Sequence, residues 1–413
     1  MLELALQRLR RHHPLRQFSF FLGLPSCSSP TADEFNKELS LGCRVPGSRH
    51  GRARQRRLRP KEAYLLLWTR VAGSGHHVNK LFVFGDSYVD TGNLGRLLGR
   101  LARSWFDPYG MTFPRKPTGR FSDGRLLTDY VAYPRTAVKA VCTWFFVAAS
   151  FLGIRSPVPY RIRKFGHKLL PYGMNFAVAG TGIFDTGNYQ SNLTTQIDKF
   201  QAQIDDGVFS RHDLKSSAAL IAVSGNDYQH LSELDPDYLH HLHGFMHRLF
   251  AQFEVDLRRL SHIGVPKVIV TNLHPVGCIP SYTRPTNYTT CYSNVSSAVA
   301  EHNRRVDELM QELGGGSNAT FLSLDSFLSS SHLFFFRVTA KGAKEIKHPL
   351  VPCCVSRSIT TECGEIDAEG NRLYRVCRRP EEHFYWDSVH PTQAGWAAAF
   401  EFLRPSLRRF LHL

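Results

Sequence analysis

Residues 81–93 read Leu-Phe-Val-Phe-Gly-Asp-Ser-Tyr-Val-Asp-Thr-Gly-Asn. Four large apolar residues without alternation predict a short strand that is buried on both faces, as strands of parallel sheets are. Gly85 ends this strand and allows the backbone to turn sharply. Asp86 and Ser87 then lie at the carboxyl end of the strand, where open α/β sheets bind their ligands. Such a serine can present its hydroxyl to a substrate, although Gly-Asp-Ser alone is more often a turn that caps a helix.

Apolar runs and helical patterns alternate along the rest of the chain. Strands are predicted within 172–183 and at 218–223, 267–271 and 320–324, and helices at 94–102, 194–206, 237–263, 295–313 and from 391 onward. The histidines of 237–263 are expected on the solvent face of their helix. This order predicts an α/β fold with three layers, in which a mostly parallel five-stranded sheet carries helices on both faces.

The positive charge is concentrated at the N-terminus. The chain has 413 residues and a formal net charge of +16, and residues 1–80 contribute +10 of it, with 15 Lys/Arg against 5 Asp/Glu. A nucleic-acid binder would place such charge on a folded face and would bind with steep salt dependence. Because the charge here lies in an arm without periodic apolar pattern, no nucleic-acid partner is expected.

Two regions follow from this distribution. Residues 1–79 are expected to be a basic, disordered extension, because they cannot bury enough apolar surface to offset the entropy of ordering. Residues 80–413 are expected to form one domain. The extension leaves two targeting interpretations open: residues 18–24 could be the apolar part of a signal peptide, and the Arg-rich, acid-poor start is also typical of an organelle transit peptide.

Cysteines and glycosylation sequons favour the secretory pathway. Of nine cysteines, Cys278 and Cys291 are close in sequence, and four others cluster at 353–377 without the spacing of a zinc site. Four Asn-x-Ser/Thr sequons accompany them, at Asn192, Asn287, Asn294 and Asn318. Together these features predict disulfides and a secreted glycoprotein. No apolar stretch of about 18 residues predicts a transmembrane helix.

A second block with catalytic potential lies near the C-terminus. Residues 386–392 read Trp-Asp-Ser-Val-His-Pro-Thr, just before the last predicted helix. A serine nucleophile needs a base within hydrogen-bond reach, and that base needs an orienting partner. Asp387 can accept from one ring nitrogen of His390 while the other faces Ser87. A lone Asp-x-x-His is more often a surface loop.

Oxyanion donors are predicted at two further strand ends. The backbone N–H of Ser87 can supply one donor, the backbone N–H of Gly180 a second, and the side-chain amide of Asn226 a third. Taken singly, Gly180 is more often a tight turn and Asn226 an Asx turn. The four blocks together, in this order and at these predicted positions, are much less expected by chance.

The combination resembles the plant GDSL-type esterase/lipases of the SGNH hydrolase superfamily. The matching blocks are Phe-Gly-Asp-Ser at Ser87, Asn-Phe-Ala-Val-Ala-Gly at Gly180, Gly-Asn-Asp at Asn226 and Asp-Ser-Val-His-Pro at Asp387 and His390. The block at 117–124, Cys278 and the 353–377 cysteines also resemble this subfamily. The resemblance spans about residues 80–403 and implies a flavodoxin-like fold and ester hydrolysis by Ser87, His390 and Asp387, without a metal or cofactor.

The chain departs from the family pattern in four places. Tyr88 stands where the family name has leucine, and we expect altered packing there rather than lost chemistry. Ala179 stands where many relatives have glycine. Segments 133–149 and 329–341 look foreign to the family, and we interpret them, with the N-terminal extension, as translated non-coding sequence or mispredicted gene structure.

The predicted function is therefore a serine ester hydrolase. Its substrate would be a lipid, an acylated small molecule or an acylated polysaccharide. The alternative is a non-catalytic lipid- or carbohydrate-binding protein with the same fold, which the presence of Ser87, Asp387 and His390 disfavours.

Overall fold

The computed structural model describes residues 78–132, 151–187, 192–316, 318–324 and 346–413. The predicted extension, apart from its last two residues, lies outside these ranges, as do both segments interpreted as foreign. The side chain of Val78 is buried in the core. The folded region therefore begins at least two residues before the predicted boundary at 80.

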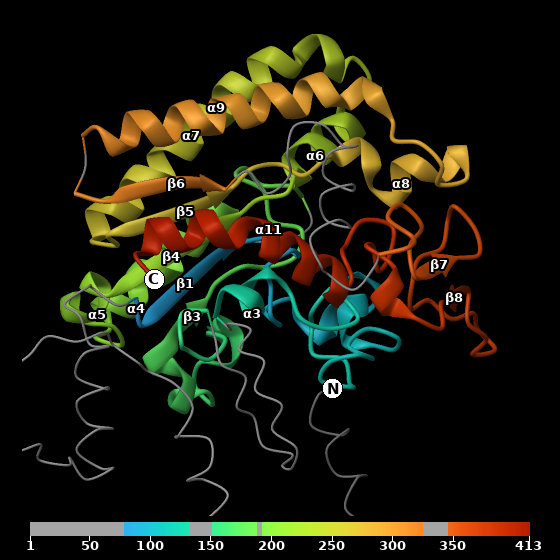
Figure 1. The fold of residues 1–413 in the computed structure, drawn as a ribbon, viewed down its shortest axis with the longest axis horizontal. Coiled ribbons are helices and arrows are strands. Elements are labelled where there is room, and N and C mark those ends of the chain that lie inside the picture. Colours follow the sequence, from blue (N-terminus) through green and yellow to red (C-terminus); the bar gives the residue numbers. More distant parts are fainter. Residues whose placement is uncertain (1–77, 133–150, 188–191, 317, 325–345) are drawn as a thin grey trace, which may run out of the picture. The chain divides into compact units, whose positions relative to one another are not determined.

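A parallel sheet lies at the centre of the described region (Figure 1). Its strands are β1 (Lys80–Gly85), β2 (Val158–Pro159), β3 (Gly173–Asn175), β4 (Ser217–Ala222), β5 (Lys267–Thr271) and β6 (Thr320–Leu324). Their order is β2-β3-β1-β4-β5-β6, and every pairing is parallel. The five predicted strands are present. The sixth, β2, escaped prediction because it is very short and half of it is a proline suited to a sheet edge.

Strand β1 is buried on both faces, as its unbroken apolar run predicts. Phe82 and Phe84 pack on one face with helices α4 (Leu193–Asp205), α7 (Tyr238–Ile263) and α9 (Ser296–Gly314). Leu81 and Val83 pack on the other face with α3 (Leu127–Ala132) and α11 (Gln393–Leu411). In Figure 1, α7 and α9 lie above the sheet, α11 crosses in front of it, and α3 lies below β1. The predicted three-layer α/β fold is confirmed.

The long helix α7 shows why the helical pattern is readable. Its buried apolar side chains recur every three or four residues, at Met246, Leu249, Phe253, Leu257 and Leu260. The helix ends at Gly264, whose φ of 111° suits glycine. Its histidines are all exposed, as expected: His240, His241, His243, His247 and His262.

Two predicted helices differ from the structure, one in its type and one in its first residue. The segment predicted as a helix at 94–102 is a run of 3₁₀ turns over Arg96–Trp105, because Gly99 has a left-handed φ of 57° that interrupts regular winding. The sequence also places Pro391 in the first turn of the last helix. Instead α11 begins at Gln393, and Thr392 caps it by accepting from the Gly395 N–H.

Shorter elements complete the described chain. The remaining helices are α5 (Arg211–Lys215), α6 (Asn226–Leu234) and α8 (Pro280–Thr283). Single 3₁₀ turns lie at Tyr160–Ile162, His167–Tyr172, Val276–Cys278, Arg284–Thr286, Ser293–Val295 and Pro380–Glu382. Strands β7 (Cys354–Ser356) and β8 (Tyr374–Val376) form a separate antiparallel pair.

Disulfides link the late part of the described chain. They join Cys278 to Cys291, Cys353 to Cys377 and Cys354 to Cys363. The sequence predicted bridges among these cysteines but left their pairing open. Within the described ranges, every helix is too short or too polar to span a bilayer.

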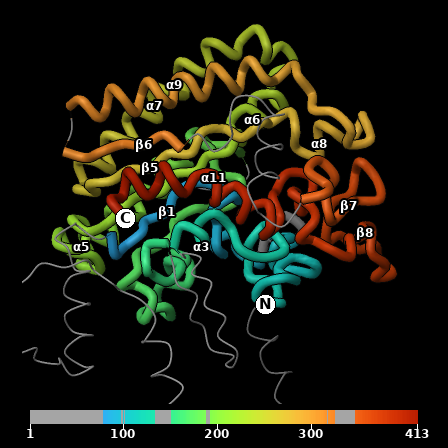
Figure 2. Tube along the Cα trace, in the orientation of Figure 1, coloured from blue at the N-terminus to red at the C-terminus, as the bar shows by residue number. Residues whose placement is uncertain are grey.

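The first and last parts of the fold meet beside the sheet. Figure 2 shows the cyan segment that follows β1 next to the red segment that precedes α11. The hydroxyl of Tyr109, in the cyan segment, donates to Asp387 Oδ2 in the red segment at 2.9 Å. Residues far apart in sequence are thereby brought to the carboxyl end of β1.

Candidate active site

The turn after β1 positions Ser87. Gly85 has a φ of 127°, and a Cβ built on it would lie 1.9 Å from the carbonyl oxygen of Ala222, so only glycine fits. The next residue, Asp86, is fully buried and accepts from the backbone N–H of Tyr88 and of Ser224. These bonds fasten the turn to the end of β4, with Ser87 only partly covered.

The loop before α11 carries Asp387 and His390. Nε2 of His390 lies 2.8 Å from Ser87 Oγ, and Nδ1 lies 2.9 Å from both carboxylate oxygens of Asp387. The structure thus brings together all three residues of the predicted triad. With Nδ1–H donating to Asp387, the Nε2 lone pair can accept the serine proton.

Asp387 is held in its charged form. Burial alone would raise the pKa of its carboxyl, but the charge of His390 and hydrogen bonds from His390 and Val389 lower that pKa to about 2. The Tyr109 hydroxyl adds a further bond, and burial raises the pKa of this phenol well above its usual value, so the phenol remains a donor.

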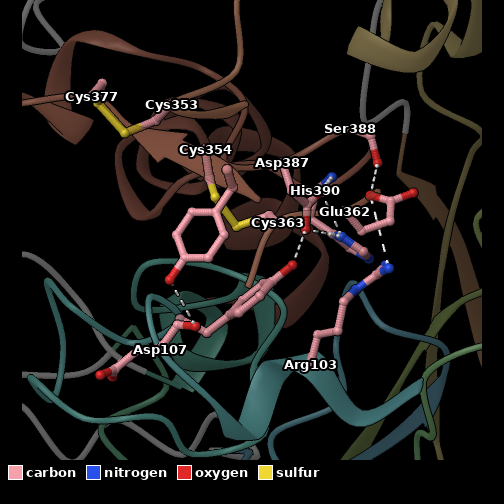
Figure 3. The surroundings of a disulfide bond; sticks show 12 residues. Arg103, Asp107, Cys353, Cys354, Glu362, Cys363, Cys377, Asp387, Ser388 and His390 are labelled. Atoms are coloured by element: carbon pink, nitrogen blue, oxygen red, sulfur yellow. Dashed lines mark hydrogen bonds and ion pairs between the residues drawn. A yellow bond between two sulfur atoms is a disulfide. The ribbon is translucent and has the colours of Figure 1, made fainter. Parts of the chain in front are cut away.

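Disulfide-bonded segments hold the loop that carries Asp387 and His390. Figure 3 shows both the Cys353–Cys377 and Cys354–Cys363 bridges beside these two residues. The backbone N–H groups of Cys353 and Cys354 donate to the carbonyls of Tyr385 and Trp386, at 2.9 and 2.6 Å. Glu362, next to Cys363, accepts from Ser388 Oγ at 3.1 Å. The loop is therefore attached from two sides to covalently closed segments.

Two of the three predicted oxyanion donors have uncommitted N–H groups. The backbone N–H groups of Ser87 and Gly180 make no hydrogen bond to any described residue. Gly180 has a φ of 86°, which favours glycine. The amide of Asn226 is engaged in this state, since Nδ2 donates to Thr181 O at 2.9 Å and to Asp86 Oδ2 at 3.2 Å.

Comparison with known proteins agrees with this geometry. Residues 81–403 match the model of the GDSL-like Lipase/Acylhydrolase family. The chain belongs to this family.

Several relatives are plant proteins. GDSL esterase/lipase At5g03610 of Arabidopsis thaliana is 38% identical over 344 residues, which cover 81% of this chain and 90% of that protein. GDSL esterase/lipase At3g09930 and GDSL esterase/lipase At2g36325, from the same plant, are 37% and 33% identical, with coverages of 80% and 88%, and of 80% and 87%. The protein is accordingly a hydrolase that acts on ester bonds.

Residue Tyr88, which departs from the GDSL pattern, makes specific contacts. Its hydroxyl donates to the carbonyl of Val389 at 3.0 Å and lies 3.1 Å from Nε2 of His274. Its ring packs edge-on against Trp396 with centroids 5.2 Å apart. At the other departure, Ala179, the backbone N–H donates to Asp90 Oδ2 at 3.0 Å.

Sequence reasoning missed four groups around this site. They are the carboxylate of Asp86, the hydroxyl of Tyr109, the imidazole of His274 and the ring of Phe121, which stacks on His390 with centroids 4.8 Å apart. No spacing signal could have found Tyr109 or Phe121, because each lies in the first third of the chain and contacts a loop near its end. Asp86 was visible as the neighbour of Ser87, but only the fold shows the donors that surround it.

Metal-ligating side chains do not gather at this site. Among the described residues, no group of three or more His, Cys, Asp or Glu side chains could hold a metal ion.

Proposed function

We propose that this GDSL family member cleaves carboxylic esters through an acyl-enzyme on Ser87. Ser87 Oγ attacks the acyl carbonyl while its proton passes to Nε2 of His390. Asp387 orients the imidazole and stabilises its charged form. His390 then gives the proton to the leaving alcohol, and a water activated by the same nitrogen hydrolyses the acyl-enzyme. The observation that carries the proposal is the 2.8 Å contact between Nε2 and Oγ.

The tetrahedral oxyanion requires donors aimed at it. The uncommitted N–H groups of Ser87 and Gly180 are suited to this role. Asn226 would add its amide when charge develops, by turning Nδ2 from Asp86, which it contacts at 3.2 Å, toward the oxyanion.

Labelling of the nucleophile tests the mechanism. A fluorophosphonate probe should label the parent, and Ser87→Ala should abolish both labelling and hydrolysis of p-nitrophenyl butyrate, with a loss of several orders of magnitude in kcat. Ser261→Ala is the control and should retain both labelling and hydrolysis. Ser261 lies near the C-terminal end of α7, just before β5 begins, at the end of the sheet opposite to Ser87. Residual kcat above about a tenth of the parent value would reject Ser87, by analogy with serine hydrolases. A folded parent without labelling or turnover would favour the non-catalytic binding protein.

We also propose that the protein is secreted and therefore functions in an oxidising compartment. The disulfides of the described chain support it, because such bridges persist in secreted proteins and are reduced in the cytosol. The sequon residues Asn287, Asn294 and Asn318 are exposed, whereas Asn192 uses its side chain to cap α4. Endoglycosidase treatment of the protein purified from plant tissue should increase its mobility, and an unchanged mobility would remove glycosylation from the proposal.

A further inference from the structure

A cavity of about 620 Å³ opens beside Ser87. One of its walls is formed by α6, α7 and α9, and the other by the segment that the Cys354–Cys363 disulfide closes. The volume lies in the range of sites that take ligands much larger than an acetyl group. An acetyl ester would therefore leave most of the space to water.

Most of the surface that lines this cavity is apolar, although serine, asparagine, glutamine and tyrosine side chains also line it. Leu242 and Met246 of α7, Ala298 and Val299 of α9, and Leu273 after β5 face it. Such a surface favours apolar ligands through the area that it removes from water.

The charged side chains of the lining are already occupied. Arg284 donates to Ser356 and Ser358. Glu362 accepts from Ser388, and its other neighbour is Arg103, 3.9 Å away. Asp86, the third charged residue, accepts the bonds described for the turn after β1. A charged head group would have to break such bonds, whereas an aliphatic chain would leave them intact.

Two large apolar side chains remain exposed along the lining. Ile359, in the disulfide-closed segment, is 87% exposed, and Leu239, near the start of α7, is 68% exposed. They come from two different segments that line the same cavity. An aliphatic chain bound in the cavity could cover both side chains and remove their apolar surface from water.

The position of the cavity relative to the triad indicates which part of the ester enters it. Ser87 and Asn226 line the cavity, as do Ser388 and Val389 of the loop that carries His390, whereas His390 itself does not. The leaving alcohol must lie beside His390, which protonates it. The part of the substrate that extends past Asn226 is then the acyl group.

From these observations we propose that the cavity is an acyl-chain subsite, and that the enzyme prefers esters of octanoic or longer aliphatic acids to acetyl esters. The proposal rests on the proposed function of Ser87. It specifies the substrate class that the sequence left open between lipids and acetylated polysaccharides.

Chain-length dependence provides the test. For p-nitrophenyl esters, kcat/KM should rise from acetate to octanoate by at least about 10²-fold, since the six added methylenes would give about 4 × 10³-fold if each were fully buried and contributed about fourfold. Ala298→Trp, which fills the cavity, should lower kcat/KM for octanoate by about tenfold or more and leave acetate within about twofold. Ala300→Trp is the matched control: it lies two positions further on α9, is exposed and does not line the cavity. It should change neither substrate.

Removal of the exposed apolar groups gives a second, milder arm. Ile359→Ser should weaken octanoate hydrolysis more than acetate hydrolysis. Ile366→Ser is its control, because Ile366 is 53% exposed and lies outside the cavity lining. Octyl acetate and ethyl acetate place the chain on the alcohol side. A stronger chain-length effect for this pair than for the p-nitrophenyl esters would overturn the assignment to the acyl group.

Other outcomes separate the subsite from the chemistry. Equal kcat/KM for acetate and octanoate with a labelled Ser87, or an equal loss on both in Ala298→Trp, would overturn the subsite and leave the mechanism standing. Binding to Ser87→Ala decides the subsite without turnover. A fluorescent dodecanoic acid analogue should bind it, and Ala298→Trp added to it should weaken that binding about tenfold while Ala300→Trp does not. No binding, or equal binding by both double variants, would reject the subsite.

Discussion

Two buried aspartates flank the candidate nucleophile, and their carboxyl groups differ in pKa. Asp86 lies in the turn after β1, and Asp387 lies in the loop before α11. Both are buried, and both accept several hydrogen bonds. Burial raises the pKa of Asp86 to about 6, although the bonds from Tyr88 and Ser224 act against it. The pKa of Asp387 is lowered to about 2 despite the same burial.

The two pKa values show that neutral donors alone do not offset the effect of burial on Asp86. Asp387 lies 2.9 Å from the ring nitrogen of His390, whose positive charge favours the carboxylate. Asp86 has no such contact, and His390 lowers its pKa less than the bonds from Tyr88 and Ser224 do. The turn with Ser87 is thus organised by hydrogen bonds to a carboxylate near its titration range. The loop with His390 is organised around the hydrogen bonds between the Asp387 carboxylate and Nδ1 of His390.

Loss of Asn226 should give the largest effect on the nucleophile side. Asn226→Ala removes both a partner of Asp86 and the proposed third oxyanion donor. We expect a fall of 10²–10³ in kcat, about 2.7–4 kcal/mol in the barrier, with a smaller change in KM. Steady-state kinetics measure kcat and KM, and a melting curve measures the loss of stability that follows from the lost contact with Asp86.

The control for Asn226 is a purely structural asparagine. Asn192→Ala removes the N-cap of α4 and should lower stability by about 1 kcal/mol without changing kcat. If Asn226→Ala behaves like Asn192→Ala, the amide only joins Thr181 to Asp86. The oxyanion assignment would then fall to Ser87 and Gly180.

The two aspartates should give stability opposite dependences on pH. The folded-state pKa of Asp86 exceeds its ordinary value of 3.8, so the native protein binds this proton more tightly than the unfolded chain does. Its contribution therefore becomes more favourable as pH falls from above 6 to about 4, by up to about 3 kcal/mol. The contribution of Asp387 is fully present above about pH 4 and is lost as pH falls through 2.

Urea unfolding at pH 7, 5.5 and 4 can separate these contributions. The stability of the parent relative to Asp86→Asn should rise as pH falls over this range. The stability of the parent relative to Asp387→Asn should stay nearly constant, because Asp387 stays ionised. A constant gap for Asp86→Asn would show that its hydrogen-bond donors keep the carboxyl pKa near the ordinary value.

Opening a disulfide should affect the His390 side selectively. The double variant Cys354→Ala/Cys363→Ala frees the segment that holds Glu362 against Ser388. Loop-closure entropy for a sequence separation of 9 predicts a loss of about 2.5–3 kcal/mol. We also expect a lower kcat at a temperature where the protein stays folded, because the Asp387 loop loses one of its attachments.

The bridge between Cys278 and Cys291 supplies the comparison. Its sequence separation of 13 predicts a similar loss of stability, and the segment that it closes contacts the Asp387 loop through one backbone bond, from the Ser281 N–H to the carbonyl of Ser388 at 2.9 Å. Removing it should lower the kcat for p-nitrophenyl acetate by less than removing the Cys354–Cys363 bridge does, because the segment of that bridge holds the loop through both Cys354 and Glu362. Equal losses of kcat in both double variants would mean that the disulfides act only through global stability.

The sequence predicted what local pattern and short motifs determine. The apolar run of β1 and the 3–4 spacing of α7 carry their own burial signal, and Ser87, Asp387 and His390 lie in blocks with recognisable spacing. Tyr109 and Phe121 could not be predicted, because their roles come from chain segments that only tertiary packing brings together. The short strand β2 and the cysteine pairing depend on packing in the same way. Tyr88 was visible as a departure, but its hydroxyl contact with the opposite loop was not.

Removal of that hydroxyl gives the smallest and most direct test of how the two sides are joined. Tyr88 directly follows Ser87 in the sequence. Its hydroxyl donates to the carbonyl of Val389, the residue before His390. Tyr88→Phe keeps the ring and removes this bond, so we expect a stability loss of about 1 kcal/mol. We also expect kcat to fall about tenfold with unchanged KM, as His390 loses its fixed distance to Ser87.

Tyr130→Phe is the matched control, because the Tyr130 hydroxyl donates to the carbonyl of Gln393 at 3.0 Å on the same segment but away from His390. It should lose similar stability and retain kcat. A parent-like kcat in Tyr88→Phe would mean that the disulfide-bonded segments alone position His390.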